Sequence, residues 1–257
     1  NYFQELDRLD IKFREFKKNK LDIEYSFDLF DMYLVDLNKF GFPITFYANC
    51  LTYYYTFIKD QYQYLDVNFK INKGDVIIDG GAWVGDVALL MANRVGKEGK
   101  VYSFEMMNEN IEIFKKNILL NEALADRITL IEKPMSSISN EKYYMNINGP
   151  ASYVSKNKPK ENNYKVVKSI SIDDFINAKQ INKVDLIKMD IEGSELDALM
   201  GAKNTILKFK PKLAICVYHK YEDFDTIPRY IDSLNLNYKF YLKHHGITRG
   251  ETVLYCK

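Results

Sequence analysis

Five short apolar segments, each ending in a polar residue, constrain the fold of this 257-residue chain more than any other feature. Most of them are followed by a segment in which apolar residues recur with the period of a helix. Short apolar runs are typical of strands buried on both faces, and a repeated strand–helix–strand order predicts a parallel sheet with helices on its faces. The predicted strands are DVIID (75–79), KVYSFE (100–105), RITLIEK (127–133), VDLIKMD (184–190) and KLAICVY (212–218).

Two of the intervening helices have recognisable ends. DVALLMANRVG (86–96) ends on Gly96, a residue type that commonly follows the last turn of a helix. NENIEIFKKNILLNEA (108–123) begins at Asn108, whose side chain is suited to cap the first turn. Its apolar residues lie on one stripe, as expected for a helix that packs on a sheet. These residues are Ile111, Phe114, Ile118 and Leu119.

Three regions depart from this alternation. Residues 136–170 lie between the third and fourth strands and predict a hairpin around Asn148-Gly149-Pro150, followed by a Lys- and Asn-rich loop. Residues 238–257 predict two strands joined by a loop, with the last strand antiparallel at its end of the sheet. Residues 1–70 carry helical spacing and a tyrosine-rich stretch, so we expect an N-terminal helical extension before a domain at 71–257.

The composition excludes several classes of function. The chain has 36 Lys and Arg against 35 Asp and Glu, and a net charge of +1 gives no broad positive surface for nucleic acid. No apolar stretch approaches the roughly 20 residues of a membrane-spanning helix, and the N-terminus lacks the apolar core of a signal peptide. The three cysteines are widely spaced in apolar surroundings, which favours reduced thiols. We therefore expect a cytoplasmic globular protein.

The loop after the first strand, DGGAWVGD (79–86), indicates a ligand site, because open α/β sheets bind ligands beyond the carboxyl ends of their strands. Gly81 and Gly85 permit a tight turn and a close approach of a ligand to the backbone. Glu105, at the end of the second strand, is placed to accept both hydroxyls of a ribose. A dinucleotide fingerprint needs glycine where Ala82 and Trp83 stand, so a pyrophosphate is disfavoured. The pattern is similar to the S-adenosylmethionine sites of class I methyltransferases.

Five segments in this order resemble the FkbM-type methyltransferase family: DGGAWVGD, SFE, LIKMDIEGSE, YHKYEDF and KHHGITRGETVLY. The resemblance covers roughly residues 60 to 257 and is most specific in IKMDIEGSE. It implies a Rossmann-like sheet of seven strands, mostly parallel with the last antiparallel, and O-methylation of a sugar or natural-product hydroxyl. Trp83, in the middle of the glycine loop, departs from the small residues of many relatives. The expected cofactor residues are Asp79, beside the methionine amino group, Gly81, Ala82, Trp83, Gly85, Glu105, Met106, Ser136 and Asp190.

The acidic segment after the fourth strand supplies the first catalytic candidates. Asp190 closes this strand beside the glycine loop, so its carboxylate is expected to face the reacting methyl group. Glu192 and Glu195 come at and inside the first turn of the next helix. They are catalytic candidates, or they stabilise the positive end of that helix, which is worth about 0.3 to 1 kcal/mol each.

The three histidines are the other catalytic candidates. His219 follows the fifth strand, and His244 and His245 end the next strand, near Arg249 and Glu251 if the last strand is antiparallel. We expect His219 to be a general base or a substrate ligand, with its pKa near the ordinary value of about 6.5. A structural role remains open for all three histidines. A metal is conceivable on Asp190, Glu192 and His219, but no spacing fixes it.

The sequence leaves two other functions open. An NAD-dependent oxidoreductase is disfavoured by Ala82 and Trp83, and a non-catalytic nucleoside-binding scaffold is disfavoured by the intact acids and histidines. A nucleic-acid methyltransferase is less favoured, because no basic aromatic patch is evident. The sequence does not identify the methyl acceptor. The tyrosine-rich residues 53–64 and the 136–170 insertion either line its pocket or serve only in packing.

Overall fold

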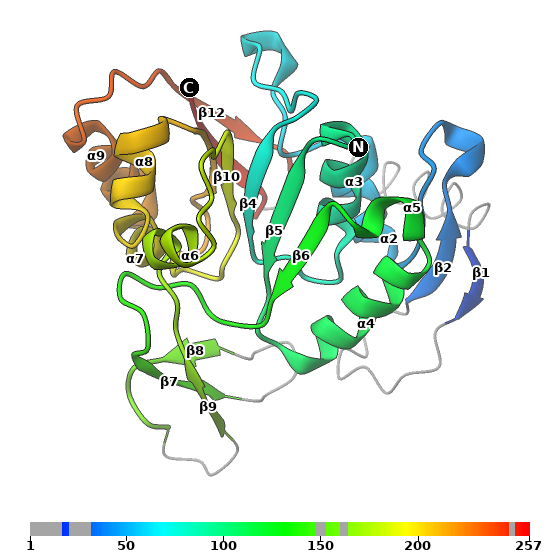
Figure 1. The fold of residues 1–257 in the computed structure, drawn as a ribbon, viewed down its shortest axis with the longest axis horizontal. Helices are drawn as coiled ribbons and strands as arrows, with labels where there is room; N and C mark the ends of the chain where they lie inside the picture. The colour runs from blue at the N-terminus through cyan, green and yellow to red at the C-terminus, as the bar shows by residue number, and fades with distance from the viewer. Residues whose placement is uncertain (1–16, 21–31, 147–152, 160–163, 247–249) are drawn as a thin grey trace.

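A computed structural model describes residues 17–20, 32–146, 153–159, 164–246 and 250–257. Its centre is a seven-stranded sheet in the order β12-β13-β11-β10-β4-β5-β6 (Figure 1). All neighbours pair in parallel except β13, which is antiparallel to β11 and to β12. The strands are β4 (Val76–Gly80), β5 (Lys100–Phe104), β6 (Ile128–Ile131), β10 (Leu186–Met189), β11 (Lys212–Cys216), β12 (Phe240–His244) and β13 (Thr252–Cys256).

The five strands predicted from apolar runs and the antiparallel last strand are therefore confirmed. Strands β10 and β11 are buried along nearly their whole lengths, as expected for central strands covered on both faces. The strand order reverses at β4, because β5 lies on one side of it and β10 on the other. A ligand crevice is expected at such a switch point, beyond the carboxyl ends of these strands.

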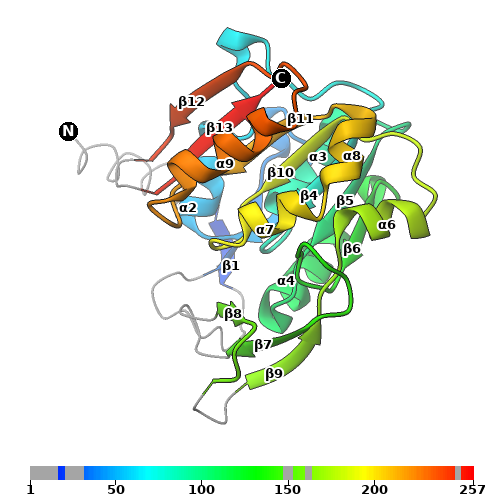
Figure 2. The same ribbon diagram turned by 90° about the vertical axis from the view of Figure 1, so that its left-hand side faces the viewer.

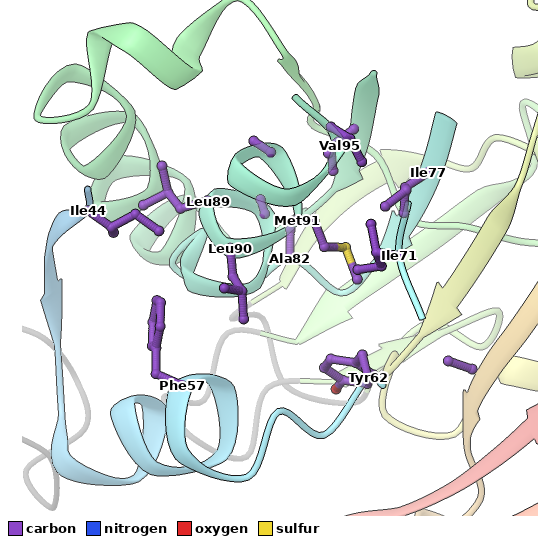
Figure 3. Packing of buried hydrophobic residues seen from close by; sticks show 14 of the residues in the cluster. Ile44, Phe57, Tyr62, Ile71, Ile77, Ala82, Leu89, Leu90, Met91 and Val95 are labelled. Carbon is purple, nitrogen blue, oxygen red and sulfur yellow. The ribbon is translucent and has the colours of Figure 1, made fainter. Parts of the chain in front are cut away.

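Helices cover both faces of the sheet (Figures 1 and 2). The predicted helices at 86–96 and 108–123 are observed on one face, and the apolar side chains of α3 pack there among residues such as Ile77 and Phe57 (Figure 3). On this face lie α3 (Asp86–Val95), α4 (Asn108–Leu119) and α5 (Glu122–Ala125). On the other face lie α6 (Ile172–Ala178), α7 (Glu195–Met200), α8 (Lys203–Phe209) and α9 (Asp223–Ser233). None of the helices in the described ranges is long and apolar enough to cross a membrane.

The N-terminal region differs from the expected helical extension. Its described residues form a three-stranded antiparallel sheet, and helical structure is limited to short segments. The residues of Thr45–Ala48 alternate between half-buried and buried, which is the two-residue period of a strand. The strands are β1 (Lys17–Lys20), β2 (Tyr33–Asp36) and β3 (Thr45–Ala48), and the helical segments are Asn38–Phe40, α2 (Cys50–Tyr53), a π-helix at Tyr54–Ile58 and Leu65–Val67. The apolar positions noted between residues 3 and 16 lie outside the described residues.

Two asparagines, Asn117 in α4 and Asn121 just before α5, hold β3 against the domain. Asn117 Oδ1 accepts a hydrogen bond from Tyr47 N at 2.6 Å, and its Nδ2 donates to Tyr47 O at 3.2 Å. One turn later, Asn121 makes the same pair of bonds to Thr45 N and Thr45 O, at 3.0 and 2.6 Å. Each side-chain amide thus replaces the backbone partner that a neighbouring strand would supply.

The predicted hairpin at 136–170 is part of a second antiparallel sheet, with order β8-β7-β9. Its strands are β7 (Lys142–Asn146), β8 (Tyr153–Ser155) and β9 (Tyr164–Lys168), and they lie away from the central sheet (Figure 1). The turn expected at residues 148–150 lies outside the described residues.

Candidate cofactor and acceptor site

The glycine loop between β4 and α3 has the backbone shape that its sequence predicts. Gly81 has a φ of +75°, and a Cβ atom there would lie 1.8 Å from the carbonyl oxygen of Asp190. Gly85 has a φ of +86°, and a Cβ atom there would lie 2.8 Å from the ring of Phe114. Trp83 also has a positive φ, +49°, which is uncommon for a bulky residue. Backbone strain of this kind gathers at ligand sites.

Glu105 ties this loop to the end of β5. Its Oε2 accepts a hydrogen bond from Trp83 N at 2.9 Å, and its Oε1 accepts from Met106 N and Met107 N, both at 2.8 Å. Burial raises the pKa of Glu105, against the lowering effect of these bonds. The expected cap of α4 is corrected here: Asn108 is the first helical residue, and the cap position is Met107, whose amide bonds to Glu105.

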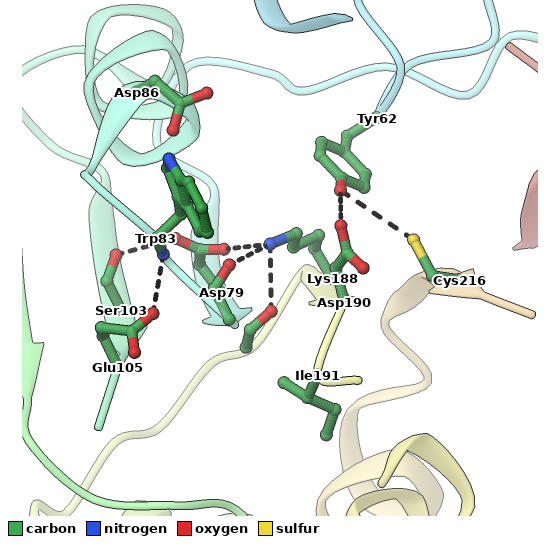
Figure 4. Close-up of polar contacts among 12 residues, drawn as sticks. Tyr62, Asp79, Trp83, Asp86, Ser103, Glu105, Lys188, Asp190, Ile191 and Cys216 are labelled. Carbon is green, nitrogen blue, oxygen red and sulfur yellow. Dashed lines mark hydrogen bonds and ion pairs between the residues drawn. The ribbon is translucent and has the colours of Figure 1, made fainter. Parts of the chain in front are cut away.

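Lys188, in the middle of the apolar β10, is a buried cation that the sequence analysis passed over. Its Nζ lies 3.1 Å from Asp79 Oδ1 and donates to Gly80 O at 3.0 Å and to Gly81 O at 2.6 Å (Figure 4). Asp79 is fully buried, and its Oδ2 accepts from Ser103 Oγ at 2.9 Å. The carboxylate of Asp79 is therefore occupied by Lys188 and Ser103, and it does not reach the cavity described below. The sequence signal that could have identified Lys188 is its place as the one lysine within the apolar run VDLIKMD.

Asp86 faces the cavity instead. It is the first residue of α3, is 4% exposed, and accepts a hydrogen bond from Thr56 Oγ1. Burial raises the pKa of Asp86 to about 6, against the lowering effects of Thr56 and Lys188. The side chain of Trp83 points toward this carboxylate (Figure 4). A desolvated carboxylate of this kind is suited to a cationic group.

Asp190 is held in an ionised state by its surroundings. Tyr62 OH donates to Asp190 Oδ2 at 2.8 Å, and Tyr218 OH donates to Asp190 Oδ1 at 3.0 Å. Burial would raise its pKa, but His219, Lys188 and Tyr62 outweigh that effect and hold the pKa well below its usual range. A carboxylate with these partners is a weak proton acceptor.

His219 lies among three carboxylates. Its Nε2 is 3.3 Å from Asp190 Oδ1 and 3.6 Å from Glu192 Oε2, and its Nδ1 is 2.8 Å from Glu195 Oε1. Burial would lower the pKa of His219, but Asp190 and Glu195 outweigh it and raise the pKa to about 10. The pKa of His219 therefore lies above the expected value near 6.5, which disfavours the general-base role that we predicted for it.

The same cluster contains candidate ligand atoms for a metal ion. Among the described residues, the ligand atoms of Asp190, Glu195 and His219 lie within 4.8 Å of one another. Both ring nitrogens of His219 are already in ion-pair contact, so the group is arranged as a salt-bridge cluster. Glu195 is fully buried and accepts from Ile191 N at 2.8 Å, which fixes the turn before α7. Glu192 is exposed, with a φ of +54°.

The remaining predicted catalytic histidines lie elsewhere. His244 is exposed on the edge strand β12, and its Nδ1 is 2.8 Å from Thr252 Oγ1. His245 is buried, and its Nε2 is 2.7 Å from Tyr255 OH. Burial and nearby lysines lower the pKa of His245 to about 4. Neither histidine lines the cavity. Arg249, which we expected beside them, lies outside the described residues.

One cavity of about 450 Å³ opens at the carboxyl ends of β4, β5 and β10. The glycine loop and Glu105 form one part of its wall, and Asp190, Tyr218 and Glu251 form another. Residues 49–62 of the N-terminal region, including Tyr55 and Tyr62, close a further side. Of the expected cofactor residues, those that line the cavity are Gly81, Trp83, Glu105, Met106 and Asp190. Those that do not line it are Asp79, Ala82, Gly85 and Ser136.

Glu251, which we expected only near the histidines, is a partly buried carboxylate of the cavity. It stands before β13 with a φ of +61°, and it lines the cavity. Burial, together with the charge of Asp190, raises the pKa of Glu251 to about 7, against a lowering hydrogen bond from Gln61. The cavity therefore contains two carboxylates with opposite pKa shifts, Asp190 and Glu251, a pairing that is common in acid–base catalysis.

The strand order and the ligand edge define a class I methyltransferase fold. A family profile described as the methyltransferase FkbM domain matches residues 79–240, and the chain belongs to this family. Its cofactor is S-adenosylmethionine. The NAD-dependent alternative is therefore not supported.

The chain is similar to several solved structures. Methyltransferase FkbM from Methylobacillus flagellatus KT is 27% identical, with a TM-score of 0.59. The match covers 77% of this chain and 47% of that protein, so the chain spans about half of its length. Fibrillarin from Aeropyrum pernix, with natively bound S-adenosyl-L-methionine, is 14% identical over 73% of this chain and 68% of that one, with a TM-score of 0.45. An O-methyltransferase from Thermotoga maritima is 14% identical over 94% and 86%, with a TM-score of 0.46. No curated protein matches the chain.

Proposed function

We propose that this protein transfers a methyl group from S-adenosylmethionine to a hydroxyl of a sugar, a glycan precursor or a related small molecule. The observation that carries the proposal is the cavity at the carboxyl ends of β4, β5 and β10. It joins the glycine loop and Glu105 to a half lined by Asp190, Tyr62, Tyr218 and Glu251. The cavity thus offers adjacent places for the cofactor and the acceptor.

The residues around the glycine loop fit the cofactor. The close approach of Gly81 to the Asp190 carbonyl leaves the loop without side-chain bulk. Glu105 is placed to bind the ribose hydroxyls. Asp86 is a buried carboxylate and is placed to bind the methionine ammonium group. When bound, S-adenosylmethionine supplies a methyl group on a sulfonium, an electrophile that any aligned nucleophile attacks in line.

Positioning is the main contribution expected from the protein, because holding two reactants in line can supply about 7 to 11 kcal/mol. The acceptor oxygen forms its bond to the methyl carbon as the carbon–sulfur bond breaks toward sulfur. The hydroxyl proton must leave at this step, and we assign its acceptor as Glu251, the cavity carboxylate whose pKa is near neutrality. Asp190, which pairs with His219, then acts by holding Tyr62 and Tyr218 in place.

A cytoplasmic location and a small-molecule acceptor, without nucleic acid, are parts of the same proposal. The three cysteines are free thiols, which suits a reducing compartment.

Cofactor binding tests the proposal directly. S-adenosylhomocysteine should raise the melting temperature, because a ligand at 100 times its Kd stabilises the native state by about 2.7 kcal/mol. Glu105→Ala should weaken this ligand strongly while the protein stays folded. A mass-spectrometric screen of sugars and glycans for the gain of one methyl group then tests turnover. Absence of binding by the wild type would contradict the proposal, and binding without turnover on any acceptor would favour a non-catalytic scaffold.

A further inference from the structure

We propose that the acceptor half of the cavity selects a hydroxyl on an uncharged or amine-bearing molecule and rejects phosphorylated and nucleotide-linked sugars. This inference rests on the proposed function and narrows its substrate class. The inference follows from the charged residues that line the cavity. It also depends on which of the positive charges are already paired with carboxylates.

The described lining residues carry a surplus of negative charge. Six of them are carboxylates and two are lysines. The carboxylates are Asp86, Glu105, Glu109, Asp190, Glu192 and Glu251, and the lysines are Lys133 and Lys188. The cofactor is itself a cation at its sulfonium and at its ammonium group, so a negative cavity suits it. The same field opposes an anionic acceptor.

Neither lysine is available to a phosphate in the acceptor half. Lys188 is 1% exposed, and its Nζ is held by Asp79 and by the carbonyl groups of Gly80 and Gly81. Lys133 is exposed after the edge strand β6, and the strands β5, β4 and β10 lie between β6 and β11, the strand that Tyr218 follows. The nearby imidazolium of His219 already contacts Asp190 and Glu195 through its two nitrogens. A phosphate in this half would face Asp190 and Glu251 without a free cation among the described residues.

The neutral groups in the same half suit hydroxyls and amines. Gln61 Nε2 lies 2.8 Å from Tyr62 OH, and both residues line the cavity together with Tyr218 and Asn49. Aromatic faces beside carboxylate and amide oxygens bind the apolar faces and the hydroxyl groups of a sugar, and they also bind a protonated amine. Glu192, at the exposed side of the wall, adds a screened negative charge.

A pair of cofactor analogues tests the charge of this wall without a known acceptor. Sinefungin carries a protonated amine at the position of the transferred methyl group, whereas S-adenosylhomocysteine carries no charge there. At pH 8, calorimetry should show that sinefungin binds about tenfold more tightly, which corresponds to about 1.4 kcal/mol. Glu251→Gln should remove most of that ratio. The matched control is Asp86→Asn, which should weaken both ligands alike and leave their ratio unchanged, because both carry the methionine ammonium group.

The acceptor side is tested with sugars in three matched forms: the methyl glycoside, the 2-amino sugar and the 1-phosphate. Methyl gain should occur on the first two forms and not on the third. Equal affinity of the two analogues, a ratio unaffected by Glu251→Gln, or methylation confined to the phosphate would each overturn the inference. Failure of S-adenosylhomocysteine to bind the wild type would instead overturn the proposed function. If none of the sugars gains a methyl group, the ratio of the affinities for sinefungin and S-adenosylhomocysteine decides whether the inference holds.

Discussion

At the scale of single residues, Lys188 is the side chain on which the cofactor loop depends most. It joins Asp79 to the carbonyl groups of Gly80 and Gly81 inside the protein. Lys188→Met would leave the Asp79 carboxylate buried without its cation, a change that costs about 3 to 5 kcal/mol. We expect a large fall in the free energy of unfolding, measured with urea, and a weaker affinity for S-adenosylhomocysteine. Lys133→Met, at an exposed lysine of the same cavity, should change the stability by less than about 0.5 kcal/mol.

The intrinsic fluorescence of Trp83 separates positioning from mere stabilisation, because the chain has one tryptophan and it lies in this loop. In conditions where Lys188→Met is still folded, its emission should differ from that of the wild type and should respond less to the ligand. Wild-type emission and affinity in the folded variant would contradict a positioning role for Lys188.

Glu251 is the residue whose role is most open to a kinetic test. Its carboxylate must be ionised to accept a proton, and its pKa is raised from 4.5 to about 7. Wild-type turnover should therefore rise with pH through about 7 and level off above it. Glu251→Gln should lower turnover by about 10² to 10⁴ and remove this dependence. Glu192→Gln, at an exposed carboxylate, should keep the dependence. Loss of rate without loss of the pH dependence would assign the proton to another group.

The sequence located the acidic side chains better than it assigned their tasks. Glu105 and Asp190 reach the cavity as the strand ends predicted. Asp79 ends its strand too, but the buried Lys188 on the adjacent strand takes up its charge, and Asp86 faces the cavity instead. Spacing along one strand fixes where a carboxylate lies. Its partner on the next strand depends on the pairing register, which a single sequence does not specify.

At the scale of elements, periodicity identified the central strands and failed for the N-terminal region. The central strands are continuous apolar runs, whereas Tyr33–Asp36 and Thr45–Ala48 are short and only partly buried. Their alternation is too short to outweigh the helical spacing around them. The polar groups that secure β3 are Asn117 of α4 and Asn121, which stands just before α5. Their role appears only when helix and strand are brought together.

These two asparagines give a prediction for the docking of the N-terminal sheet. Asn117→Leu would leave the amide and carbonyl groups of Tyr47 without partners, and each buried unpaired group costs about 1 to 3 kcal/mol. We expect lower stability and faster hydrogen exchange at the amides of Thr45 and Tyr47, with unchanged exchange in β4 and β10. Asn108→Ala, on the exposed side of the same helix, should have little effect. Uniform exchange changes across the domain would show that the two layers do not open separately.

At the scale of the whole molecule, the cavity is assembled from distant parts of the chain. Residues 49–62 and Glu251 belong to the two ends of the described chain, and the glycine loop and Asp190 come from the central sheet. Occupation of the cavity therefore links these parts, and a ligand that binds only the native state stabilises the whole fold. The charge state of the wall then determines how strongly global stability responds to the ligand.

The dependence of ligand stabilisation on the charge of the cavity wall tests whether Asp86 binds the ammonium group of the cofactor. The pKa of Asp86 is raised from 3.8 to about 6, so its carboxylate is mostly ionised at pH 7.5 and mostly protonated at pH 5. Only the ionised form pairs with the ammonium group of S-adenosylhomocysteine. The affinity should therefore fall about tenfold between pH 7.5 and pH 5, and the stabilisation at a fixed saturating concentration should shrink by about 1.4 kcal/mol.

Scanning calorimetry at the two pH values measures this difference. Asp86→Asn should bind more weakly at pH 7.5 and lose most of the pH dependence, because the amide carries no charge at either pH. Glu105→Gln is the matched control, since Glu105 also has a raised pKa and lines the same cavity. It should weaken the ligand but keep the dependence that Asp86 causes. If the dependence follows Glu105 and survives in Asp86→Asn, the ammonium group of the ligand does not lie at Asp86.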